Sequence, residues 1–339
     1  MRIDDLLRGV LFRGFRLGSL RFDFLEGLLA VCITGAGYLL RTPFEPGVPH
    51  WTCLLAEWYL CLASAVLVGR YTGSRRKSLG TYGILMILPA VVAEGTILGG
   101  GACAGALLFV CALLFLGQGQ GNGRTWLFTL VTAGLLLWSV RYIGLLFACM
   151  VLWKKGRLRV EQLLVLLAAG GARFVHAYRA WFGAGYTLET FHWPNIYELV
   201  GREAVQGQLV DPAACVGFFL TLGLMLFLIH LYRPGEQEEE PASLLRLFLF
   251  FGLTCGYFLP YMDQSYGILY SVLAVLYFMT ALEEFLLPML LQIVVFAGYQ
   301  ECFHGASMMP MALFSALQFL IICLLGMQIY VTSGERRHG

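Results

Sequence analysis

Apolar runs long enough to cross the hydrocarbon core of a bilayer recur along this chain from Phe24 to Tyr330. A core of roughly 30 Å is crossed by a helix of about 20 predominantly apolar residues. Hydrophobic residues make up 59% of the sequence and charged residues only 13%, against about 25% charged residues in a soluble domain. We therefore expect an all-α, polytopic transmembrane helical bundle in the cell membrane, with no room for a separate soluble domain.

Segmenting the apolar runs predicts about twelve spans. They are expected at residues 24–40, 53–69, 79–97, 102–116, 125–140, 142–153, 161–177, 213–232, 244–260, 267–282, 285–299 and 308–331. This divides the chain into an N-terminal segment 1–23, a transmembrane domain 24–331 with a long external loop near 179–212, and a tail 332–339. Five arginines among leucines and phenylalanines in residues 1–23 predict an amphipathic helix on the membrane surface; a plain basic flank is the alternative.

The basic residues predict the orientation, because Lys and Arg are retained on the cytoplasmic side. Loops assigned to the inside carry them in groups: Arg70, Arg75, Arg76 and Lys77; Arg124; Lys154, Lys155, Arg157 and Arg159; Arg233; Arg336 and Arg337. Loops assigned to the outside carry them singly: Arg41, Arg141, Arg173, Arg179 and Arg202. Both termini are thus expected in the cytoplasm.

Two function classes are disfavoured by composition. The ten cysteines lack paired metal-ligand spacing and most lie inside apolar runs, so no metal site and no cofactor are expected. The net charge of +2 is too small to indicate a nucleic-acid partner.

Five segments occur in an order that resembles the multi-spanning GT-C glycosyltransferases, particularly the bacterial mannosyltransferase-like members that use polyprenyl-phosphate sugar donors. They read YLLRTPFEPG, LMILPAVVAEGTILGGGACAGALLF, SVRYIGLLF, HWPNIYELVG and FLPYMDQSYGILY. The resemblance implies a GT-C-like fold in a bacterial plasma membrane, a lipid-linked sugar as partner at the outer face, and an acidic base in the first external loop, where Glu45 is the carboxylate present. Glu94 stands as a displaced carboxylate in the turn after the third helix.

Other candidate residues follow from their chemistry. Arg141 interrupts an apolar stretch and could bind a phosphate through its planar donor fork, or extend to the lipid headgroups. The external loop combines donors with aromatic faces that suit sugars, and the later turn is a polar group between two apolar helices. The expected substrate-binding residues are Arg141, His192, Trp193, Asn195, Tyr197, Asp263, Gln264 and Tyr266.

Two intramembrane carboxylates, Glu57 and Glu94, are functional candidates by default, although pairing with a cation such as Arg141 explains them equally well. Three functions stay open at this stage. The first is a transferase, or a degenerate relative, handling a polyprenyl-phosphate sugar. The second is a non-catalytic scaffold or binding subunit, with a membrane-protein partner, which the short first loop favours. The third is a transporter of lipids or small molecules.

Overall fold

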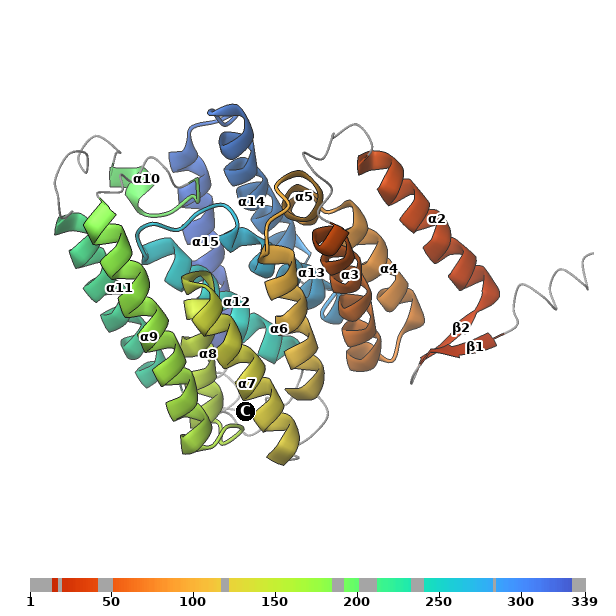
Figure 1. The fold of residues 1–339 in the computed structure, drawn as a ribbon, viewed down its shortest axis with the longest axis horizontal. Coiled ribbons are helices and arrows are strands. Elements are labelled where there is room, and N and C mark those ends of the chain that lie inside the picture. Colours follow the sequence, from red (N-terminus) through yellow and green to blue (C-terminus); the bar gives the residue numbers. More distant parts are fainter. Residues whose placement is uncertain are drawn as a thin grey trace, which may run out of the picture.

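The computed structural model describes residues 14–17, 20–41, 51–116, 122–184, 192–200, 212–232, 241–282 and 285–330. Helices run up and down between two ends of the molecule, as Figure 1 shows. The helical class expected from the sequence is confirmed. Glu45, His50 and the C-terminal tail lie outside the described residues.

Each expected apolar segment coincides with helix. The first half comprises α2 (Phe24–Arg41), α3 (Trp51–Thr72), α4 (Arg75–Ile87), α5 (Pro89–Val92), the π-helix η1 (Ala93–Ile97), α6 (Ala102–Leu116), α7 (Asn122–Trp138) and the 3₁₀ turn η2 (Val140–Tyr142). The second comprises α8 (Ile143–Lys154), α9 (Val160–Ala184), α10 (Tyr197–Val200), α11 (Pro212–Leu231), α12 (Pro241–Phe258), α13 (Tyr266–Thr280), α14 (Leu286–His304) and α15 (Met311–Tyr330).

The number of membrane-crossing helices is lower than the expected twelve. Within the described residues, five helices are long and apolar enough to cross a membrane, namely Thr52–Thr72, Val160–Arg179, Pro241–Phe258, Leu286–His304 and Met311–Tyr330. A sixth span results if Arg75–Ile87 and Pro89–Ile97, which meet at an angle of 54°, are taken together. Helices such as α6, α8 and α13 are apolar but have only 15, 12 and 15 residues, short of the roughly 20 that a straight crossing needs.

The prediction of an amphipathic helix in residues 1–23 is wrong for the part of that segment that the structure describes. Gly14–Leu17 (β1) and Leu20–Asp23 (β2) pair as antiparallel strands, with Phe15 opposite Phe22 and Arg16 opposite Arg21. Both stretches alternate apolar with polar residues, and this two-residue period is typical of a strand rather than a helix. Gly18 and Ser19, between them in the sequence, are turn-type residues.

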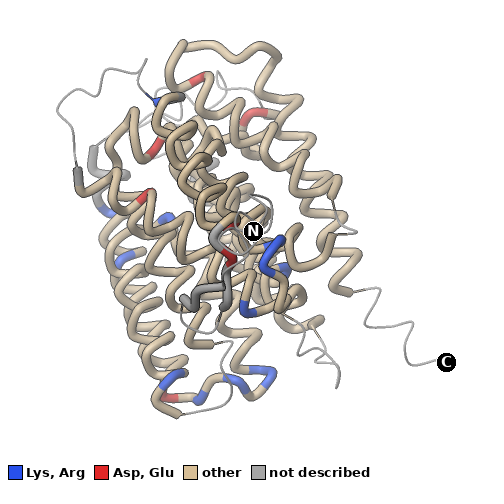
Figure 2. The backbone as a smooth tube through the Cα atoms, turned by 90° about the vertical axis from the view of Figure 1, so that its right-hand side faces the viewer, with Lys and Arg blue, Asp and Glu red and all other residues tan. Residues whose placement is uncertain are grey.

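Several basic residues lie at the end of the bundle that is lower in Figure 1, where Figure 2 colours parts of the backbone tube blue. There Lys154 Nζ donates to the carbonyls of Ile229, His230 and Tyr232 at 2.9, 3.0 and 2.5 Å, so that it ties α8 to the end of α11. Arg75 bridges to Asp23 and Glu26 at 3.2 and 3.3 Å. The basic end is the one assigned to the cytoplasm; the orientation itself stays a prediction.

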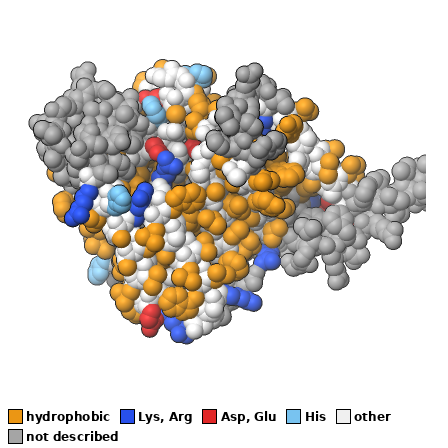
Figure 3. Space-filling view, viewed as in Figure 1, with side chains coloured by type: hydrophobic (Ala, Val, Ile, Leu, Met, Phe, Trp, Pro, Cys, Tyr) orange, Lys and Arg blue, Asp and Glu red, His pale blue; other side chains and the backbone are white. Residues whose placement is uncertain are grey.

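The outer surface between the two ends is apolar. Hydrophobic side chains cover the middle of the face in Figure 3, and charged side chains lie toward its upper and lower margins. Leu39 and Phe219 are each 68% exposed. Such a surface is unfavourable in water and suits hydrocarbon, so the surface agrees with a membrane protein.

The centre of the bundle is built from α12 and α13, which lie together in Figure 1. Glycines on α12 admit tyrosine rings of α13: a Cβ at Gly252 would overlap the Tyr270 ring, and one at Gly256 would overlap Tyr266. Gly144 of α8 approaches just as closely, since its Cβ would lie 2.8 Å from the Cα of Gly252. Small residues therefore set the helix spacing, as is common in membrane proteins.

Replacing Gly252 by alanine is expected to destabilise the protein by about 1–3 kcal/mol, because the added methyl overpacks the junction of α8, α12 and α13. Thermal unfolding in detergent measures the effect. Gly134→Ala is the control, since no heavy atom lies within 4 Å of its Cβ position and its stability should be unchanged or slightly higher. Equal melting temperatures for the two variants would contradict the close crossing.

Candidate functional site

A group of polar residues lies at the upper end of the bundle, opposite the basic end. We call it the Arg141 cluster: Glu94 of η1, Arg141 of η2, Asp263 and Ser265 of the α12–α13 turn, and Tyr299 of α14. These residues come from segments that are up to 205 positions apart in the sequence. Only the tertiary structure brings them together.

The accessible part of the cluster is the ion pair between Arg141 and Asp263. Arg141 Nη2 donates to Asp263 Oδ2 at 2.6 Å, and the two side chains are 34% and 26% exposed. Ser139 positions the arginine by accepting a hydrogen bond from its backbone N–H at 3.3 Å. Asp263 Oδ1 is buried and has no hydrogen-bond partner among the described residues. One carboxylate oxygen is thus buried without a donor from the described part of the chain.

Glu94 forms the buried part, with 1% of its surface exposed. Its Oε1 accepts a hydrogen bond from Tyr299 Oη at 3.1 Å, and the Ser265 side chain also hydrogen-bonds to it. Arg141 and Asp263 are close enough to act on it electrostatically. Glu94 therefore lies behind the Arg141–Asp263 pair, as a second carboxylate in the same electrostatic environment.

The backbone that carries Glu94 departs from α-helix. The helix breaks at Leu88, where Pro89 starts α5, and five residues later the chain forms the π-helix η1. Leu98 N–H bonds to Ala93 O at 2.8 Å and Gly100 N–H to Glu94 O at 3.0 Å, so the carbonyls are satisfied locally. Single π-turns occur frequently at functional sites, and irregular backbone at membrane depth is tolerated where it is buried in protein or lines a cavity.

Glu57 lies on the other side of η1 and has its own partners. Arg41 binds its Oε1 through both Nε, at 2.9 Å, and Nη2, and Thr96 Oγ1 donates to its Oε2 at 3.1 Å. Arg41 and Glu57 are 7% and 3% exposed. A Cβ at Gly95 would overlap the Glu57 carboxylate, so glycine is needed there for this approach. Arg141, the cation that the sequence offers as a partner for Glu57 or Glu94, forms its ion pair with Asp263.

The aromatic segment at residues 192–200 is mostly buried. Trp193, Asn195 and Tyr197 are 0%, 4% and 8% exposed. Tyr197 Oη donates to Phe258 O at 2.9 Å, Ser315 Oγ donates to Asn195 O at 2.5 Å, and the Trp193 ring lies 5.5 Å from that of Tyr266. These side chains anchor the segment on α12, α13 and α15.

His192 and Gln264 lie at the edge of the Arg141 cluster. A Cβ at Gly298, the residue before Tyr299, would lie 2.8 Å from the His192 carbonyl and 3.7 Å from Gln264 Cβ. His192 Nδ1 is buried with no hydrogen-bond partner in the described part of the chain. Tyr266, in contrast, is 1% exposed and donates to Gly252 O at 2.6 Å inside the core.

The structure thus brings together Glu94, Arg141 and Asp263, while the His192 backbone and Gln264 pack against α14 at Gly298. The core next to this region contains the buried residues Trp193, Asn195, Tyr197 and Tyr266. Sequence reasoning missed Tyr299 and Ser265, because a lone tyrosine in an apolar helix and a serine in a turn carry no distinguishing pattern. The sequence carries a weak signal for the Arg41–Glu57 pair, because both are charged residues in apolar segments at the same expected depth in the membrane.

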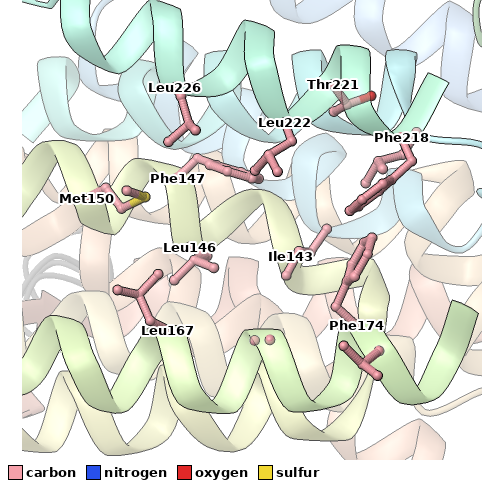
Figure 4. A pocket seen from close by; sticks show the side chains of 14 residues that line it. Ile143, Leu146, Phe147, Met150, Leu167, Phe174, Phe218, Thr221, Leu222 and Leu226 are labelled. Carbon is pink, nitrogen blue, oxygen red and sulfur yellow. The ribbon is translucent and has the colours of Figure 1, made fainter. Parts of the chain in front are cut away.

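An apolar groove runs between α8, α9 and α11 (Figure 4). Its volume is about 230 Å³. Ile143, two residues after Arg141, and Leu259, four residues before Asp263, are among its lining residues. In Figure 4, Phe174 and Phe218 point toward each other across the groove, and their rings stack at 4.5 Å. The Arg141 cluster and the apolar groove are therefore formed in part by the same two chain segments.

Comparison of the chain with family models, with curated proteins and with solved structures found no match. Among the described residues, no group of three or more His, Cys, Asp or Glu side chains could hold a metal ion. The site must therefore be interpreted from its own geometry.

Removing one member of the buried Arg41–Glu57 pair is expected to cost about 3–5 kcal/mol, because the remaining charge is left without its partner. Replacing both residues together, as Arg41→Met with Glu57→Leu, should cost less than either Arg41→Met or Glu57→Leu alone. Unfolding by denaturant in detergent measures the four stabilities.

Arg75→Met supplies the control at an exposed ion pair and should change stability by about 1 kcal/mol or less. Additive losses in the double variant would show that Arg41 and Glu57 do not depend on each other.

Proposed function

We propose that this protein binds a lipid-linked sugar of the polyprenyl-phosphate type at its upper end, as a glycosyltransferase of GT-C type or a degenerate relative of one. One observation carries the proposal: a partly exposed Arg141–Asp263 pair, a second carboxylate at Glu94, and an apolar groove beginning at the same two chain segments. A lipid phosphate needs a cation for its head and apolar surface for its chain; Arg141 and Asp263 are two and four residues from the groove-lining Ile143 and Leu259 in the chain.

The guanidinium of Arg141 is suited to the phosphate. Asp263 takes one of its donors, Nη2, and a planar fork with five N–H groups can bind a phosphate through the others. In a transfer reaction, the bond between the sugar carbon and the phosphate oxygen breaks as the acceptor oxygen bonds to that carbon. Arg141 would stabilise the charge that stays on the leaving phosphate.

A carboxylate would take the proton of the acceptor hydroxyl. Asp263 is better placed than Glu94, because its side chain is 26% exposed whereas Glu94 is 1% exposed. Glu94 would act on Arg141 and Asp263 through its charge and hold Tyr299 and Ser265 in position. Glu45 remains a candidate for the base from the sequence; it lies outside the described residues.

The groove between α8, α9 and α11 would receive the start of the prenyl chain. Its wall in Figure 4 consists of leucine, isoleucine, phenylalanine and methionine side chains, with Thr221 as the polar exception among the labelled residues. The hydroxyl of Thr221 is already bonded to Gly217 O at 2.6 Å, so it presents no open donor. A branched hydrocarbon chain fits such a lining.

Mass spectrometry of lipids that co-purify with the protein tests the binding step. Wild type should retain a polyprenyl phosphate or its sugar adduct, and Arg141→Ala with Asp263→Ala should lose it, because the phosphate loses its cation. The matched control is Arg157→Ala with Glu161→Ala, which removes one positive and one negative charge at the opposite end and should leave retention unchanged. Bulk phospholipid alone in all three samples would count against the site.

Asp263→Asn separates catalysis from binding. If the protein is a transferase, release of labelled mannose from polyprenyl-phosphate mannose should fall by about 10²–10⁴-fold, the usual contribution of general-base catalysis, while lipid retention persists. Turnover absent in wild type as well, with the lipid still bound, would identify a binding subunit. Unchanged turnover in the variant would remove Asp263 from the reaction.

Transport is a second candidate, favoured by the broken span at Leu88–Pro89. Discontinuous helices whose ends meet buried charges are typical of transporter binding sites, and Glu94 lies directly after such a break. In that case reconstituted protein should move a labelled polyprenyl phosphate across a liposome membrane, and Glu94→Gln should slow it at least tenfold. Binding without movement across the liposome would exclude this candidate.

A further inference from the structure

Three basic residues lie on one face of α9 near its upper end, namely Arg173, His176 and Arg179. A spacing of three residues keeps neighbours on the same side of a helix. In Figure 3, side chains coloured as Lys, Arg or His lie together over the upper part of α9, on the left of the view. We call these three residues the α9 basic face. None of them forms an ion pair with another residue that the structure describes.

Arg173 lies below the end of the apolar part of α9. This helix is one of those long and apolar enough to cross a membrane, and the apolar stretch ends at Arg179, six residues or about 9 Å further up. Arg173 is partly exposed, but its Nε is buried and has no hydrogen-bond partner among the described residues. The side chain therefore runs against protein instead of extending freely to the lipid headgroups. An arginine at such a depth is a candidate for a functional site.

The lower part of the α9 basic face lies at the depth of η2, the turn that carries Arg141. Helix α9 packs against η2 as well as against α7 and α8. A Cβ at Gly170 would lie 3.3 Å from Cδ1 of Ile143, the residue after η2. Arg173 is less than one helical turn above this contact, and Arg141 precedes it by two residues in the chain.

The upper part of the face is joined to the turn that carries Asp263. The ring of Tyr178 lies 6.5 Å, edge-on, from the ring of Tyr261, which is two residues before Asp263. Tyr261 has a φ of +63°, a backbone conformation that is uncommon outside glycine and persists only where the surrounding structure holds it. Arg173 is therefore placed on α9 between two contacts that lead to the two members of the Arg141–Asp263 pair.

The Arg141 cluster has no net positive charge of its own. Asp263 offsets the charge of Arg141, and Glu94 adds a further acidic group. A phosphate diester is an anion, so its attraction to this cluster alone rests on hydrogen bonds and not on opposite charge. Arg173 and Arg179 bring two more positive charges to the same side of the molecule, in partly buried surroundings where charges are screened less than in water.

We infer that the α9 basic face completes the phosphate site: Arg173 and Arg179 bind the phosphate of the lipid-linked sugar together with Arg141. This inference rests on the proposed function and names the cations that supply the affinity. Arginine is suited to it, because its planar fork binds two phosphate oxygens at once. Phe174 and Val175, directly after Arg173, line the apolar groove, so one helix would contact both the head and the chain of the lipid.

Native mass spectrometry of the whole protein in a non-ionic detergent tests the inference. It measures the affinity for added polyprenyl phosphate and for the polyprenol of the same length, which lacks the phosphate. Arg173→Gln with Arg179→Gln should lower the affinity for polyprenyl phosphate at least tenfold, or about 1.4 kcal/mol, because two cations are removed. The affinity for polyprenol should stay unchanged, since the groove lining is intact, and this shows that the variant is folded.

The matched control is Arg76→Gln with Arg159→Gln, which removes two exposed arginines at the lower end of the bundle. It should leave both affinities unchanged. An equal loss of polyprenyl phosphate in the control and in the α9 variant would indicate an effect of total charge and overturn the inference. Phosphatidylglycerol carries the same phosphate chemistry. If the α9 variant lost its binding to the same extent, the face would belong to bulk lipid headgroups, which would also overturn the inference.

Arg141→Ala with Asp263→Ala separates this inference from the proposed function. If that variant loses the preference for polyprenyl phosphate over polyprenol while the α9 variant keeps it, the proposed function stands and the α9 basic face is not part of the site. If wild type binds the two lipids equally well, the proposed function fails and the inference fails with it.

Discussion

The structure depends on how it satisfies two carboxylates, Glu57 and Glu94, that flank one π-helix inside an apolar bundle. A charge in such surroundings is costly unless it is paired or hydrogen-bonded. Glu57 accepts hydrogen bonds from Arg41 at the end of α2 and from Thr96 of η1. Glu94 draws in Tyr299 of α14 and Ser265 of the α12–α13 turn. These contacts join α2 to α3 and η1, and join α14 to η1.

The two ends of the molecule differ in their polar contacts. At the upper end, helix breaks and short turns bring Glu94, Arg141 and Asp263 together, and Ile143 and Leu259, which follow and precede two of them in the chain, line an apolar groove. At the lower end, Lys154 ties α8 to α11 through carbonyl contacts. Ion-paired carboxylates occur at both ends, with Asp23 and Glu26 at Arg75 below and Asp263 at Arg141 above.

Apolar runs predicted where the helices lie, because a helix in lipid needs continuous apolar sequence and little else. They predicted the number of crossings less well. The segment at 79–97 is interrupted because Pro89 has no N–H and disfavours helical backbone at Leu88. The strands at Gly14–Leu17 and Leu20–Asp23 differ from the expected surface helix, because a short two-residue alternation forms strands even where arginines are frequent.

The sequence by itself determined the class of structure, the apolar character of the surface and the residue types for a polar site, since these depend on composition and local periodicity. It identified Glu94, Arg141 and Asp263 singly. Only the tertiary structure decided that Arg141 pairs with Asp263 across 122 positions while Arg41 pairs with Glu57. The physical reason is that helix packing decides which charged side chains can meet. Glycines such as Gly95 and Gly252 permit the close approaches in this packing because they carry no side chain.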